Sequence, residues 1–304
     1  MKKFTKFVLS SATIAVAAGI VLSGIGFAVN GAHNINIIWD KGFKFAGDKE
    51  LETLEKTTLD SFSNMNIDVD AAKIYFKQND SDEYAIEYKL YSSGVKCEVK
   101  NDTLLVEQNP EQINFNFFNF PDVSDCYLTV YYPEGCDFDS IKVDSSAGAI
   151  NAVEGLNCSL LDMDSSAGAI KLDGFKGAIT VDSSAGAFEA KNSEFTKVTM
   201  DMSAGGITFI NCTIGGGKID SSAGGLEATD LILKGNLSCD MSAGSVDIEL
   251  VDGDAIGFDF DVSAGSIKID GNKVASNDDY NENTNADVVL TVDSSAGSIA
   301  ITHK

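Results

Sequence analysis

The string VDSSAGAI fills residues Val143–Ile150, and close variants of it return seven more times before the chain ends. Each copy carries a glycine, and successive glycines are 18 to 21 residues apart, with one final interval of 32. The eight glycines are Gly148, Gly168, Gly186, Gly205, Gly224, Gly244, Gly265 and Gly297. A fixed period near 20 residues is typical of a solenoid, in which each repeat adds one coil.

Apolar residues alternate with polar ones on both sides of each repeat glycine. Positions two and four after the glycine are mostly apolar, as in Ile170 and Leu172, and so are positions five and seven before it, as in Met163 and Leu161. A period of two indicates strands with one buried face, and no helical spacing lies between them. The sequence therefore predicts an all-β fold, a parallel β-helix or solenoid of about eight two-strand coils.

The Ser-Ala-Gly string itself predicts a tight corner that can stack on identical corners. Glycine allows positive φ and alanine adds little bulk. A serine lies two residues before the glycine in all eight copies. We expect its hydroxyl to bond backbone groups freed by the turn, or the serine of the next coil.

An aspartate stands four residues before every repeat glycine. By the same alternation, all eight point outward and form one line, the aspartate column. Its members are Asp144, Asp164, Asp182, Asp201, Asp220, Asp240, Asp261 and Asp293. Carboxylates about 5 Å apart repel by roughly 1 kcal/mol per pair in bulk water. Other interactions must therefore compensate for this repulsion in the folded protein.

Three interpretations of the column are open. The first is structural: each carboxylate accepts turn N–H bonds while water and salt screen the rest. The second is calcium bound between coils, although the glycine-rich pattern of calcium-binding β-rolls is missing. The third, acid/base cleavage of a glycan, needs two carboxylates in different environments, and eight equivalent ones argue against it.

The N-terminus predicts a membrane anchor. Residues 1–6 carry Lys2, Lys3 and Lys6 and would form a cytoplasmic tip, because positive residues stay inside. Residues 7–29 form an uncharged run of 23, long enough for one transmembrane helix or an uncleaved signal anchor. A cleaved signal peptide is the alternative, although its apolar part is usually shorter. Everything after residue 30 would then lie outside the cell.

The remaining chain divides into three predicted parts. Residues 30–60 are expected to be a juxtamembrane spacer, 61–140 an irregular β region and cap, and 141–304 the repeat solenoid. Within the cap, Ile67–Ile74 aligns with VDSSAGAI and predicts a degenerate first coil, while Ile113–Phe120 is expected to cover a solenoid end or to form an exposed patch. Residues 272–287 are a polar insertion, expected to be a loop.

The six cysteines contain no C-x-x-C pair, which argues against structural zinc. Cys126 and Cys136 flank a Pro-Glu-Gly turn and are candidates for a disulfide. The favoured interpretation is that most cysteines are buried small apolar residues, as Cys239 is at a core position.

Composition excludes several functions. The net charge is −24 and the chain has no arginine, so nucleic acid is not a predicted partner. The two histidines, His33 and His303, lie near opposite ends of the sequence, and no phosphate loop, dinucleotide fingerprint or nucleophile elbow is present. We therefore predict no catalytic residues, no cofactor-binding residues and no enzymatic activity.

Three stretches together resemble a known family: SFSNMNIDVDAAKIYF (61–76), VKNDTLLVEQ (99–108) and the serial DSSAGAIK-type units. They are similar to the bacterial putative-adhesin β-strand-repeat domain, found in Gram-positive surface proteins. The resemblance spans about residues 60–304 and implies a parallel β-helix at the cell surface. It supplies no catalytic motif.

Together these features predict a single-pass membrane protein with most of its chain extracellular. The predicted function is a non-catalytic adhesin or surface binding and spacer module, whose partner is a surface glycan or protein. The alternative is an envelope-stress or regulatory protein that binds a neighbouring membrane protein.

Overall fold

The computed structural model describes residues 36–38, 42–44, 51–91, 94–108, 125–251 and 255–304. Strands β1 (Asn36–Ile38) and β2 (Gly42–Lys44) form an antiparallel pair within one unit. All other described strands belong to a second unit. The described part of the chain contains no helix long and apolar enough to span a membrane. The predicted transmembrane segment 7–29 and the predicted cover 113–120 lie outside the described residues.

Each Ser-Ala-Gly repeat forms one coil of two strands joined at the glycine corner. In the central coil, β14 (Glu194–Met202) leads into the corner and β15 (Ile207–Ile214) leads out of it. Along β14 the residues Phe195, Val198 and Met200 are buried between exposed neighbours. The predicted alternation is confirmed, and it gives every coil an apolar inner face.

Eight such coils are present. Strands entering and leaving the successive corners are β10 (Asp137–Ala147) with β11 (Ile150–Ala152), β12 (Asn157–Asp173), β13 (Lys176–Lys191), β14 with β15, β16 (Gly217–Ser221) with β17 (Leu226–Leu233), β18 (Leu237–Met241) with β19 (Val246–Leu250), β20 (Ile256–Val262) with β21 (Gly265–Ile269), and β24 (Val288–Ser294) with β25 (Gly297–His303). In β12 and β13 the strand continues through the corner without a break.

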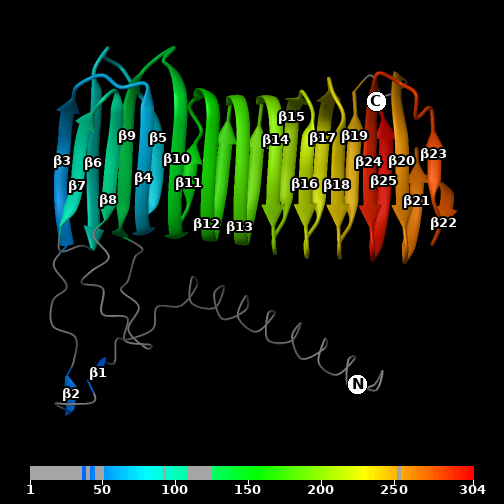
Figure 1. The fold of residues 1–304 in the computed structure, drawn as a ribbon, viewed down its shortest axis with the longest axis horizontal. Coiled ribbons are helices and arrows are strands. Elements are labelled where there is room, and N and C mark those ends of the chain that lie inside the picture. The colour runs from blue at the N-terminus through cyan, green and yellow to red at the C-terminus, as the bar shows by residue number, and fades with distance from the viewer. Residues whose placement is uncertain (1–35, 39–41, 45–50, 92–93, 109–124, 252–254) are drawn as a thin grey trace. The chain divides into compact units, whose positions relative to one another are not determined.

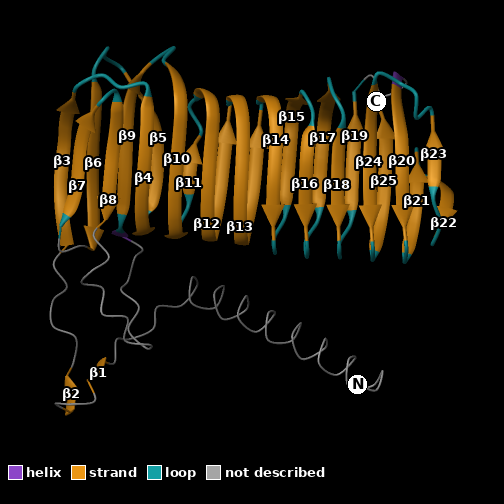
Figure 2. Ribbon diagram, in the orientation of Figure 1, coloured by secondary structure: helices purple, strands orange, loops and turns teal. Residues whose placement is uncertain are grey.

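Neighbouring coils pair in parallel and in register (Figure 1), as the repeat predicts. Strands make up most of each coil, with loops at the coil ends (Figure 2). Strands that enter the corners pair with one another, as do strands that leave them, and the side chains between these two layers of strands make the core. Inward residues such as Ile179, Phe188 and Phe209 are at most 1% exposed. The predicted all-β solenoid is confirmed.

The last two coils are stacked in reverse of their order in the sequence. β24 pairs with β18 on one side and β20 on the other, and β25 likewise lies between β19 and β21. In Figure 1 the red strands stand between the yellow and orange ones. The coils at this end therefore do not stack in the order in which they occur in the sequence. Coils that share one register pattern can pair in more than one order.

The outer coil at this end is covered by the insertion 272–287. Here β22 (Asn272–Ser276) pairs antiparallel with β21, and β23 (Tyr280–Glu282) pairs antiparallel with β20. The expectation of a plain loop is wrong. These short polar strands occupy the backbone edges that the last coil would otherwise leave open.

The opposite end has a matching reversal. β4 (Asn64–Ala71) and β5 (Lys73–Asn79) pair with β10 and β11, which confirms the predicted degenerate coil. The next coil outward comes later in the sequence and consists of β8 (Thr103–Gln108) and β9 (Tyr127–Pro133).

Antiparallel strands finish this end. β7 (Val95–Lys100) pairs with β8, β6 (Tyr84–Tyr91) pairs with β9, and β3 (Leu51–Leu59) pairs with β6. The prediction of a spacer is thus wrong for residues 51–59. Pairing across the sheet overrides the charged appearance of that segment.

Candidate functional site

The glycine corners explain why the repeat is kept. A Cβ added at Gly205 would lie 1.5 Å from the carbonyl oxygen of Gly186 in the preceding coil, and Gly205 has φ +128°. The Gly205 N–H donates to the carbonyl of Ala223 in the following coil. The corner therefore needs glycine both for its backbone conformation and for the close approach of the preceding coil.

The serines of the corner divide into two columns. The predicted one, two residues before the glycine, is exposed, as in Ser146 and Ser222. The residue before it is buried, and Ser145, Ser221 and Ser294 are at most 4% exposed. Their Oγ atoms have no hydrogen-bond partner in the structure. Sequence reasoning missed this inner column, although the alternation around Asp144 places Ser145 on the core face.

The aspartate column is a single file. Cα register pairs run from Asp68 to Asp144, and then through the repeats to Asp240 and Asp293. The file ends on Asp261. Parallel neighbours in a sheet are about 4.8 Å apart. The degenerate coil thus extends the predicted column by one carboxylate.

At two members of the column, Asp182 and Asp293, the neighbouring carboxylates help to raise the pKa. Burial and then the charges of Asp164 and Asp201 raise the pKa of Asp182. Burial and then the charges of Asp261 and Asp240 do the same for Asp293. Partial compensation comes from lysine, since Lys218 Nζ lies 2.7 Å from Asp220 Oδ2.

Removing one charge from the column should stabilise the protein. Because the folded-state pKa of Asp182 is raised, its ionised form opposes folding at neutral pH, and this cost disappears as the pH falls through the raised pKa. Asp182→Asn should therefore raise the free energy of unfolding at pH 7 by about 1 kcal/mol or less. It should also flatten the rise in stability between pH 7 and pH 4, measured by urea unfolding.

Asp162→Asn is the matched control, because it makes the same charge change on the same face. The register neighbours of Asp162 are Lys142 and Thr180, so it has no carboxylate on either side. A stability gain as large for Asp162→Asn as for Asp182→Asn would contradict repulsion within the column.

Calcium binding by the column was an alternative interpretation and not the prediction, which was that the column holds no metal. Among the residues that the structure describes, no three His, Cys, Asp or Glu side chains are grouped to hold a metal ion. The column places its carboxylates in one line, whereas calcium takes six to eight oxygen ligands around a point.

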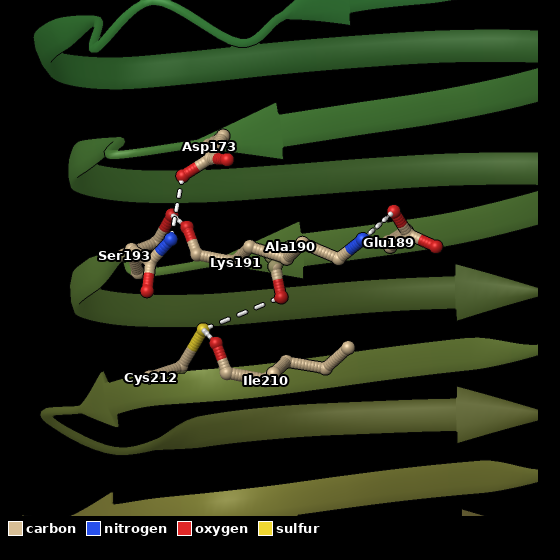
Figure 3. Close-up of polar contacts among 8 residues, drawn as sticks. Asp173, Glu189, Ala190, Lys191, Ser193, Ile210 and Cys212 are labelled. Carbon is tan, nitrogen blue, oxygen red and sulfur yellow. Dashed lines mark hydrogen bonds and ion pairs between the residues drawn. The ribbon is translucent and has the colours of Figure 1, made fainter.

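The edge opposite the glycine corners is held by a ladder of polar side chains. Asn192 Nδ2 donates to Asp173 Oδ1 at 2.9 Å, and Asn211 Nδ2 donates to Asn192 Oδ1 at 2.8 Å. Both asparagines have positive φ, which this residue type tolerates well. Ser193, beside them, donates to the Lys191 carbonyl at 2.6 Å (Figure 3).

Four of the six cysteines are buried, as the favoured interpretation predicts. Cys126, Cys158, Cys212 and Cys239 are at most 3% exposed, and none of the six cysteines is in a disulfide. Burial raises the pKa of the Cys239 thiol to about 12. Cys212 lies in the second half of β15, where its Sγ donates to the carbonyl of Ile210 (Figure 3). Cys126 and Cys136 do not form the candidate disulfide.

A second surface lies on the outer face of β5, β6 and β9, with one residue from β3, and we call it the tyrosine–lysine surface. Its residues are Lys56, Lys73, Tyr75, Lys77, Glu87, Lys89, Tyr127 and Tyr131. Tyr75, Tyr127 and Tyr131 are half-buried, and they surround Thr129, which is 2% exposed. Cα register pairs place Tyr75 and Glu87 on either side of Thr129.

Contacts within this surface fix the side chains. Lys56 Nζ lies 3.8 Å from the centre of the Tyr131 ring, and Tyr131 donates to Glu87 Oε1 at 2.8 Å. Burial and the Glu87 bond raise the pKa of Tyr131 to about 12, so its hydroxyl stays protonated at neutral pH. This surface was not among the sites predicted from the sequence. Its signal was the alternation Tyr127, Thr129, Tyr131 on one face of a strand.

His303, which lies among the described residues, makes a structural contact with Asp270. Its Nδ1 lies 3.0 Å from Asp270 Oδ2, and its backbone N–H donates to Asp270 Oδ1 at 2.9 Å. These bonds lower the pKa of Asp270. The pair ties the last strand to the turn after β21.

The fold and its corners define a parallel β-solenoid built from Ser-Ala-Gly coils. The chain belongs to the Toastrack DUF4097 family, whose model matches residues 62–302. This agrees with the resemblance to the putative-adhesin β-repeat domain. No match was found among curated proteins.

Solved structures with a similar fold come from bacteria. A putative lipid binding protein from Parabacteroides distasonis ATCC 8503 is 16% identical, covers 85% of this chain and 98% of its own, and has a TM-score of 0.51. A putative adhesin from the same organism is also 16% identical over 85% and 98%, with a TM-score of 0.46. The first likeness shows a shared fold.

Proposed function

We propose that the protein is a non-catalytic binding module displayed outside the cell, and that the tyrosine–lysine surface contacts its partner. The observation that carries the proposal is the group of half-buried tyrosines and lysines on the outer face of one sheet. In the eight repeats, the residues that occupy the register position of Tyr75 are polar or small, such as Asn151, Lys171 and Glu189.

A surface glycan is the partner that this chemistry fits best. Tyrosine presents an apolar ring with a polar tip and loses little conformational entropy on binding. A sugar ring has an apolar C–H face and hydroxyls at its rim. Tyr75 and Tyr127 offer ring surface, while Lys77, Lys89 and Glu87 offer hydrogen bonds to hydroxyls.

The sheet beneath supports such a role. The tyrosines stand on strands whose inward neighbours, Ile74, Leu128 and Val130, are fully buried. Side chains on packed strands are held more accurately than side chains on loops. The coils behind them then act as a spacer of fixed geometry.

Tyr75→Ala and Tyr127→Ala should each weaken binding to wall-glycan fragments by about fivefold or more, since truncating a central interface tyrosine typically costs over 1 kcal/mol. Isothermal titration of the purified protein against fragmented cell wall checks this. Glu227→Ala, an exposed outward change on β17, should leave binding unchanged. Equal affinity in all variants would contradict the proposal, as would crosslinking in membranes to one defined protein without glycan binding.

The extracellular location rests on the predicted anchor, residues 7–29, and is tested separately. Protease added to intact cells should remove residues 51–304 from the membrane fraction, as followed by an antibody against the repeats. Full protection on intact cells, with cleavage after lysis, would contradict display outside the cell.

A further inference from the structure

The coil made by β24 and β25 is held between two coils that precede it in the sequence. On one side β24 pairs with β18 over Leu237–Met241, and on the other it pairs with β20 over Ile256–Val262. β25 pairs with β19 and β21 in the same way. We call residues 288–303 the inserted coil, and the space it fills the slot.

The inserted coil belongs fully to the core. Its inward side chains Leu290, Val292, Ile299 and Ile301 are at most 1% exposed. The glycine corner is equally tight, since a Cβ on Gly265 would lie 1.5 Å from the Gly297 carbonyl oxygen. Leaving the slot empty would therefore expose a whole layer of apolar surface.

The strands on the two sides of the slot, β18 and β20, both pair with the inserted coil in a single register. Leu290 faces Leu237 on one side and Phe258 on the other, and Asp293 faces Asp240 and Asp261. These pairs depend on the pattern of side chains and backbone groups. They do not depend on which chain supplies the coil.

The connection from β21 to the inserted coil is long and weakly packed. Residues 270–287 include only the short strands β22 and β23, and the buried apolar core has no member between Ile267 and Leu290. Eighteen extended residues span at most about 60 Å. The connection can thus reach beyond the slot of its own molecule without disturbing the core.

We propose that the slot also accepts the inserted coil of a second copy of this chain, so that two copies exchange residues 288–303. Exchange preserves the pairings of β24 and β25 and the burial of their inward side chains, because each slot is filled by an identical coil. The short strands β22 and β23 would leave β21 and β20 so that the connection can extend. Such swaps are a low-cost route to association between identical chains. The slot is then a self-association site, separate from the tyrosine–lysine surface.

Two variants of the full chain, each with one added cysteine and with Cys97 and Cys136 replaced by serine, test the exchange. Ser238 and Thr291 are register partners on adjacent strands, at a separation that suits a disulfide. In Ser238→Cys and Thr291→Cys mixed, unfolded and refolded together, a disulfide between residues 238 and 291 can form only across two molecules. We expect a covalent dimer, with this bond identified by mass spectrometry.

The double variant Ser238→Cys/Thr291→Cys should form the same bond within one chain at low concentration. Mixing Ser238→Cys with Thr180→Cys gives the mismatched control, because Thr180 pairs with Asp162 and Thr199. If the double variant closes while the matched mixture yields no more dimer than the mismatched one, exchange is ruled out. Failure of the double variant to close would contradict the stacking order itself.

Discussion

Gly205→Ala lowers the free energy of unfolding by about 3 kcal/mol or more. The new methyl group would lie 1.5 Å from the Gly186 carbonyl oxygen, and residue 205 has φ +128°. Overpacking costs about 1–3 kcal/mol, and an unfavourable backbone conformation adds about 1–3 kcal/mol. The first penalty arises from stacking on the preceding coil, and the second from the backbone conformation of the corner. Urea unfolding followed by circular dichroism measures the loss.

The adjacent glycine is the control. A Cβ at Gly206 would meet nothing within 4 Å. Gly206→Ala should therefore change stability by no more than about 0.5 kcal/mol. If both variants lost the same stability, the corners would not be stacked as described.

Phe209→Ala costs about 3–5 kcal/mol, the usual range for deleting a buried ring. Phe209 is 1% exposed, and its ring centre lies 5.6 Å from that of Phe188 and 5.8 Å from that of Phe195. These rings come from adjacent coils, on β13, β14 and β15, and they meet in the core. The change therefore leaves a cavity in the middle of the solenoid. Thermal and urea unfolding give the difference from the parent protein.

Thr208→Ala is the control for Phe209→Ala. Thr208 comes directly before Phe209 on the same strand, points outward and is half-buried. Its effect should stay below about 1 kcal/mol, within the range of strand propensity. A loss for Thr208→Ala that matched the loss for Phe209→Ala would mean that the inward and outward faces are assigned wrongly.

The coil is the part of the fold that the sequence predicts best. Glycine spacing and two-residue alternation identify the corner at Gly148, the inward Ile150 and the outward Asp144, and the structure places each as expected. This works because a strand has only two faces and because each repeat gives the same answer independently.

The order of the coils cannot be predicted in this way. Any coil with the same register pattern can pair with any other, so the sequence does not distinguish the place of β24 from that of β20. The polar segments at the two ends of the solenoid, 51–59 and 272–287, lack clear alternation. They form strands because open backbone edges need partners.

The tyrosine–lysine surface was missed for a similar reason. Tyr75 and Tyr131 are 56 residues apart in the sequence and meet only because β5 pairs with β9. Alternation within a single strand places each ring on the outer face. Only the pairing of two distant strands brings them together.

The central claim is that Ser-Ala-Gly corners lie directly over one another, and that the coil with Gly297 lies between the coils with Gly244 and Gly265. Spin labels at the exposed corner serines measure this, in a background with Cys97 and Cys136 replaced by serine. From Ser166, the label at Ser295 is five coils away and the label at Ser263 is six. Pulsed dipolar spectroscopy should give about 24 Å and about 29 Å, at about 4.8 Å per coil. A shorter distance to Ser263 than to Ser295, or distances that do not grow with the number of coils, would contradict the account.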